Sequence, residues 1–78
     1  MKNQPASKGE GLVKRSVSLA GHATSLALEG EFWTVLEALA KSRAVSLARL
    51  IANIDAERAD RPLASACRLA ALRFVRCG

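Results

Sequence analysis

The sequence predicts a mostly α-helical domain with a short N-terminal β-strand, and three observations predict it. Residues 23–28 alternate in polarity with the period of two that is typical of a strand, so that Thr24, Leu26 and Leu28 share one face. Three amphipathic segments with a period of about 3.6 residues follow. Hydrophobic residues make up 50% of the 78 residues, which favours a globular chain over a disordered one.

The strand at residues 23–28 needs a partner, because a single strand cannot satisfy its own backbone hydrogen-bonding groups. A small domain often gains stability by association. We therefore expect this strand to pair with the same strand of a second copy of the chain. Such a two-stranded antiparallel ribbon, carried by a helical dimer, is a known device for reading the DNA major groove.

An additional strand is expected upstream, at about residues 14–19, where polar and aliphatic side chains alternate. Residues 20–22 break this alternation, which predicts a turn or bend before the next strand. Residues 1–13 are polar and basic and contain one proline and two glycines, so we expect a flexible tail. Residues 14–76 then form a single domain.

Three helices are expected, at about residues 30–43, 46–58 and 62–76. Each carries one apolar stripe at helical spacing. The stripes are Phe32, Val35, Leu36, Leu39 and Ala40 in the first helix, Leu47, Leu50, Ile51 and Ile54 in the second, and Leu63, Ala66, Cys67, Ala70 and Phe74 in the third. Ser46 suits the N-cap of the second helix. Trp33 lies off the first stripe, which predicts packing against another element or a second subunit.

Charge is distributed unevenly along the chain, whose net charge is +5. Residues 1–28 hold four basic residues and one acidic residue, residues 29–60 hold four and six, and residues 61–78 hold four arginines and no acidic residue. Basic ends around a mildly acidic middle suit an anionic partner such as nucleic acid. An arginine-rich solvated helical surface is the other interpretation of the same charges.

The sequence contains few residues that could carry catalysis. His22 is the single histidine, tyrosine is absent, and no phosphate-binding loop or pair of acids is present. Cys67 and Cys77 are ten residues apart and match no common metal spacing, so we expect reduced thiols. No apolar run approaches the ~20 residues of a membrane helix. The expectation is a cytoplasmic protein without enzymatic activity, metal, cofactor or membrane partner. His22 is expected to fix the bend before the strand or to pack at the end of the ribbon, and a pH-sensitive contact or a DNA contact is the other interpretation.

The order of strand, helix, short turn and helix resembles the ribbon-helix-helix proteins of the Arc and MetJ repressor superfamily. More specifically, the chain from Lys14 to Arg76 resembles a small bacterial ribbon-helix-helix domain family. The resembling segments are Lys14–His22, Thr24–Glu29, Glu31–Trp33, Ser46–Ile51, Ile54–Asp55 and Leu63–Arg68. Gly21-His22 followed by Thr24-Ser25, together with Glu31-Phe32-Trp33, is the most specific combination.

The resemblance implies an intertwined homodimer whose strands pair between subunits as a two-stranded ribbon. It places seven residues in a shared dimer core: Leu26, Leu28, Phe32, Leu36, Leu39, Leu50 and Ile54. It implies that Ala23, Ser25 and Ala27 face the major groove of double-stranded DNA. It also implies that backbone amides at Ser46 and Leu47 bind a phosphate, as helix N-termini do for general physical reasons.

The outward positions depart from the usual chemistry of base recognition. Base edges are commonly read by Arg, Lys, Asn or Gln, whereas this face offers Ala23, Ser25 and Ala27. Lys14 and Arg15 supply a basic arm for phosphate contacts. Two functions therefore stay open: a DNA-binding protein that acts as a small transcriptional regulator, and an oligomerisation or protein-interaction module with the same fold that does not bind DNA.

Overall fold

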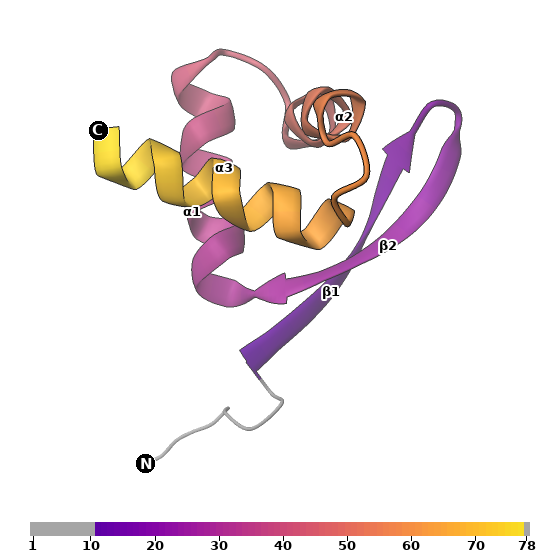
Figure 1. The fold of residues 1–78 in the computed structure, drawn as a ribbon, viewed down its shortest axis with the longest axis horizontal. Coiled ribbons are helices and arrows are strands. Elements are labelled where there is room, and N and C mark those ends of the chain that lie inside the picture. The colour runs from indigo at the N-terminus through magenta and orange to yellow at the C-terminus, as the bar shows by residue number, and fades with distance from the viewer. Residues whose placement is uncertain (1–10, 78) are drawn as a thin grey trace.

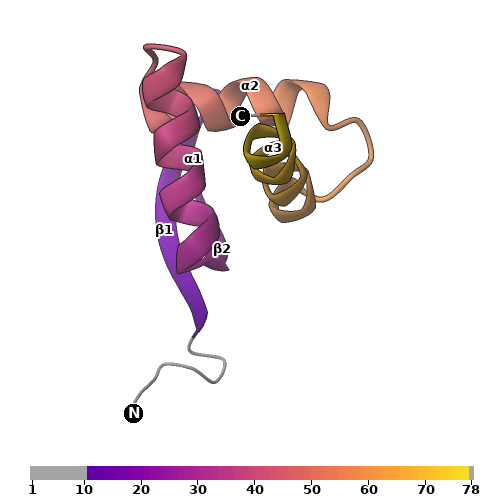
Figure 2. The ribbon, with the colours of Figure 1, turned by 90° about the vertical axis from the view of Figure 1, so that its left-hand side faces the viewer.

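The computed structural model describes residues 11–77, which form a β-hairpin followed by three helices. Figures 1 and 2 show the hairpin as a twisted ribbon with the helices gathered on one side of it. The elements are β1 (Leu12–Leu19), β2 (His22–Glu29), α1 (Gly30–Ser42), α2 (Leu47–Glu57) and α3 (Leu63–Cys77). β1 begins two residues before the expected boundary of the tail, and residues 1–10 of that tail lie outside the described residues.

The two strands pair antiparallel over their full lengths, from Leu12 opposite Glu29 to Leu19 opposite His22. A two-residue turn connects them, with φ angles of 50° at Ala20 and 89° at Gly21. Positive φ at both central positions is the pattern of a type I′ turn, whose twist matches that of the flanking strands. The turn expected near residues 20–22 is thus confined to two residues.

β1 of the same chain, which we expected as an additional strand beside a ribbon formed between two copies, pairs with one edge of β2. A short loop brings the two strands together at a small entropic cost. The other edge of β2 has no strand partner within residues 11–77, so pairing of β2 with its copy in a second chain stays a prediction.

The hydrophobic core lies between the inner face of the hairpin and the three helices. Its fully buried side chains are Leu28, Leu36, Leu50, Ile51 and Cys67. Of the seven residues that we assigned to a shared dimer core, five are buried within the single chain, and Phe32 and Ile54 are half-buried. A single chain therefore supplies most of the burial that we had ascribed to a dimer.

Trp33 belongs to the core, although its position lies off the predicted stripe of α1. Its side chain is only 4% exposed, and its Nε1–H donates a hydrogen bond to the carbonyl oxygen of Val13 at 2.8 Å. Helix α1 therefore uses a second buried face toward β1. This hydrogen bond holds the start of β1 against α1.

The junction between α1 and α2 is short, and backbone hydrogen bonds close the end of α1. The Val45 N–H donates to the carbonyl of Ala40 and the Ala44 N–H to that of Lys41, both at 3.0 Å, which is the Schellman pattern of a helix C-terminus. Ser46 then caps α2, because its Oγ accepts a hydrogen bond from the Arg49 N–H at 3.0 Å. Ser46 is thereby confirmed as the N-cap. The two helices cross steeply, as Figure 2 shows.

Helix α3 is tied to the corner between β2 and α1. The Arg68 Nε donates to Glu29 Oε1 at 3.0 Å, and its guanidinium carbon lies 5.8 Å from the centroid of the Phe32 ring. Cys67 points into the core beside this contact. The third helix is thus an integral part of the domain.

Candidate nucleic-acid interface

The face of the hairpin that points away from the helices presents a strip of small side chains. We call it the outer ribbon face, and it consists of Lys14, Ser16 and Ser18 on β1 and Ala23, Ser25 and Ala27 on β2. The register places Lys14 opposite Ala27, Ser16 opposite Ser25 and Ser18 opposite Ala23. All are exposed except Ala27, which is half-buried.

The expected outward residues Ala23, Ser25 and Ala27 therefore share one surface with residues of the same chain's first strand. Three serine hydroxyls offer hydrogen-bond donors and acceptors, and serine can contact any base edge. Lys14 is the single charged side chain of the outer ribbon face. Small side chains allow the backbone of the ribbon to approach a groove closely, but they give no bidentate contact to a base.

Arg15 lies on the opposite side of the hairpin from Lys14. Its Nη1 is 3.1 Å from Glu37 Oε2, and its guanidinium carbon lies 4.7 Å from the centroid of the Trp33 ring. We had grouped Arg15 with Lys14 in one basic arm, but successive residues of a strand point to opposite faces. The structure thus uses the Arg15 charge within the molecule, to hold β1 against α1.

The N-terminus of α2 is the second candidate contact. The first amides of an α-helix have no intrahelical acceptor and attract anions. One of these amides, that of Arg49, is satisfied by Ser46, while Leu47 is half-buried at the first helical position. Figure 2 shows α2 beginning on the side of the hairpin and ending near α3, and α2 packs against β1.

Basic residues lie close to this helix end in the sequence, and we did not assign them to the site in reading the sequence. Lys41 and Arg49 are exposed, lie within five residues of Ser46 and form no ion pair within residues 11–77. The first turn of α2 holds no acidic residue, so Arg49 stands at the positive end of the helix dipole without compensation. The signal in the sequence was a pair of basic residues flanking an N-cap serine.

His22 opens β2 beside the turn, opposite Leu19, and is exposed. The cysteines are free thiols, Cys67 buried and Cys77 exposed. Burial raises the pKa of the Cys67 thiol to about 11, so this group stays protonated near neutral pH. Across residues 11–77 no cluster of three metal-ligating side chains occurs.

The described part of the chain also holds no helix that is long and apolar enough to cross a lipid bilayer.

Comparison with known proteins supports the fold. The family model described as a ribbon-helix-helix domain matches residues 12–75, from the start of β1 to near the end of α3. The match therefore includes the first strand and the third helix. No curated protein and no solved structure matches the chain significantly.

Proposed function

The chain belongs to the ribbon-helix-helix domain family, and from this membership we propose that it is a small transcriptional regulator that binds double-stranded DNA through the outer ribbon face. Proteins of this family are generally DNA-binding regulators. The observation that carries the proposal is the register of the hairpin, which aligns Lys14 and the hydroxyls of Ser16, Ser18 and Ser25 on one exposed surface. A major groove admits a two-stranded ribbon of this width.

Phosphate contacts supply most of the affinity in this proposal. The α2 N-terminus at Ser46 and Leu47 would receive one phosphate, with Lys41 and Arg49 beside it. Lys14 would contact the backbone at the edge of the groove. Because the outer ribbon face lacks Arg, Asn and Gln, we expect a modest preference for base sequence and a strong dependence on salt.

A homodimer is part of the proposal, because family members typically form one. Within residues 11–77, β2 has one edge without a strand partner, since β1 occupies the other. Pairing of two β2 edges would join two hairpins into one sheet and would keep their outer faces on the same side. A dimer of this kind would extend the surface that contacts DNA.

The test is fluorescence anisotropy of a labelled random-sequence duplex, titrated with the protein across a series of salt concentrations. We expect binding that weakens steeply with salt, and a further loss of about 3–10-fold in Lys14→Ala. Arg76→Ala is the matched control, because Arg76 is exposed near the end of α3 and lies outside both candidate contacts. No binding at low salt, or equal losses in the two variants, would contradict the proposal.

The second candidate function is an oligomerisation or protein-interaction module with the same fold. The short side chains of the outer ribbon face favour it, since Ala23 and Ala27 offer methyl groups where base-reading proteins place longer polar groups. This function predicts self-association without DNA binding. Because the DNA-binding proposal also includes a homodimer, the anisotropy titration distinguishes the two, and sedimentation equilibrium shows whether a protein that does not bind DNA still associates.

A further inference from the structure

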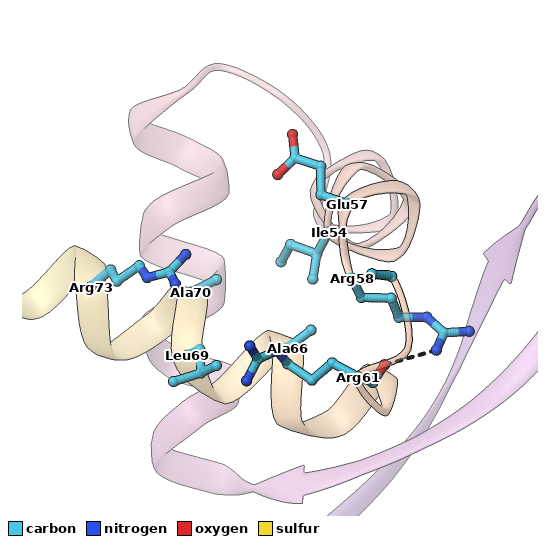
Figure 3. Close-up of a pocket in the computed structure, with 9 residues that line it drawn as sticks. Ile54, Glu57, Arg58, Arg61, Ala66, Leu69, Ala70 and Arg73 are labelled. Atoms are coloured by element: carbon cyan, nitrogen blue, oxygen red, sulfur yellow. Dashed lines mark hydrogen bonds between the residues drawn. The ribbon is translucent and has the colours of Figure 1, made fainter.

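A groove runs between α2 and α3 and reaches the C-terminal end of α1, on the helical side of the molecule. It consists of two adjoining hollows, of about 250 and 320 Å³, which share Ile54, Glu57, Ala70 and Arg73 in their walls. We call it the α2–α3 groove. Figure 3 shows Ile54 reaching from α2 toward α3, with Ala66, Ala70 and Arg73 along the facing side of α3.

The floor of the groove is apolar. Ile54, Leu69 and Phe74 are half-buried, and Ala66 and Ala70 leave room between the two helices because their side chains are small. Half-buried aliphatic and aromatic side chains beside a hollow gain free energy when another apolar side chain covers them. The floor thus suits aliphatic side chains of a ligand.

The rim of the groove is cationic. Arg43, Arg61 and Arg73 line it and form no ion pair within the described residues, and Glu57 is the single acidic residue among the lining side chains. Arg58 also lines it, but its Nε donates to Asp55 Oδ1 at 2.6 Å and its Nη1 donates to the carbonyl of Arg61 at 2.8 Å. This contact fixes the loop that carries Arg61.

We propose that the α2–α3 groove docks an acidic amphipathic segment of a partner protein. Aliphatic side chains of that segment enter the two hollows, and its carboxylates pair with Arg61 and Arg73 at the rim. Apolar anchors surrounded by complementary charge are the usual composition of a groove that receives a helix. The proposal does not depend on DNA binding, because it uses none of the residues of the outer ribbon face.

Charge argues against the other occupants. A second copy of the chain, docked symmetrically, would bring the same arginine rim against itself. The N-terminal residues 1–10 carry Lys2 and Lys8 against Glu10, so they do not complement a cationic rim. Duplex DNA would leave the apolar side chains of the floor uncovered. The groove also lies among the helices and not on the outer ribbon face.

The test uses a fluorescein-labelled synthetic helix of about 15 residues, with leucines on one stripe and glutamates on the remaining face. We expect binding with a dissociation constant on the order of 10 μM, as for a small transient interface. Arg73→Glu should weaken it at least about tenfold, and Arg73→Gln by a smaller factor. Arg76→Glu, on the same helix but outside the groove, is the matched control.

A second peptide, in which lysine replaces every glutamate, reports whether charge selects the occupant. Equal affinity for the two peptides, equal affinity of Arg73→Glu and Arg76→Glu, or no binding of the acidic peptide would overturn the proposal. A self-association lost in Arg73→Glu would assign the groove to a second copy instead. A DNA affinity reduced by Arg73→Glu as much as by Lys14→Ala would assign it to nucleic acid, which also overturns it.

Discussion

Lys14 and Arg15 are neighbours in β1 but use their charges on opposite sides of the ribbon. Lys14 is exposed on the outer ribbon face, whereas Arg15 stacks on Trp33 and pairs with Glu37. Cation–π and exposed ion pairs each contribute up to about 1 kcal/mol. The alternation of a strand already separates these two residues, so the sequence contained the signal that they could not form one surface.

Glu29 accepts a hydrogen bond from Arg68 of α3, so protonation of its carboxylate should weaken the packing of α3. The hydrogen bond from Arg68 is the main cause that lowers the pKa of Glu29 below its ordinary value of 4.5. Because the pKa of Glu29 is lower in the folded state than in the unfolded state, its ionised form stabilises the fold. This stabilisation is complete above the pKa of the unfolded state and is lost as the pH falls through the pKa of the folded state. The wild type should therefore lose its stability advantage over Glu29→Gln below about pH 4.5.

Chemical unfolding of the wild type and Glu29→Gln between pH 7 and pH 3 measures this effect. An NMR titration of the Glu29 carboxyl group in Arg68→Gln is the control, and there the pKa should return toward its ordinary value. A stability difference that stays constant across this range would show that the ion pair between Glu29 and Arg68 does not hold α3 in place.

At the scale of elements, the periodicities predicted where strands and helices lie, but not which strands pair. Alternation in residues 14–19 and 23–28 indicates which face of each strand is buried, and that pattern is the same whether the partner is the neighbouring strand or a second chain. The turn at Ala20 and Gly21 pairs one edge of β2 with β1, and the pattern is silent on the other edge. The second buried face of α1 was likewise hidden, because Trp33 packs against β1, which lies far from it in sequence.

Helix α1 ends with a residue whose conformation glycine would adopt more easily. Ala44 has a φ of 58° at the position after the C-cap, where the Cβ of alanine is strained. Ala44→Gly should therefore raise the free energy of unfolding by about 0.5–1 kcal/mol, after allowing for the entropy that glycine adds to the unfolded chain. Urea denaturation measures the change.

Ala38→Gly is the matched control for that substitution, because Ala38 is exposed in the middle of α1. There the same change should lower the free energy of unfolding by about 1 kcal/mol. If both variants lose stability, the left-handed conformation of Ala44 is not the source of strain.

At the scale of the whole molecule, the candidate sites combine residues that the sequence keeps apart. Ser46 as N-cap and the outward positions of β2 followed from local patterns. The contribution of β1 to the outer ribbon face followed from pairing, and the α2–α3 groove joins Arg43 to Arg73 across thirty residues. Such surfaces depend on how three helices pack, which no local periodicity encodes.

Because a single chain forms its own core, the stability of the whole fold should depend on the side chains buried in that core. Leu28 is fully buried without a second copy, so Leu28→Ala should lower the free energy of unfolding by about 2–5 kcal/mol. We expect this loss at every protein concentration. Thermal unfolding over a hundredfold range of concentration measures it, with the exposed Leu72→Ala as control. A midpoint that rises with protein concentration would mean instead that unfolding is coupled to dissociation of a dimer.

The two-residue turn between β1 and β2 also has a kinetic consequence. Hairpins of this kind form in about 1–10 μs, because the contacts along them are local in sequence. Here the hairpin precedes all three helices in the chain, so it emerges from the ribosome ahead of them and its strands can begin to pair before the helices pack on it. Formation of the hairpin is then a first-order step, and its rate does not depend on the concentration of the protein in the cell.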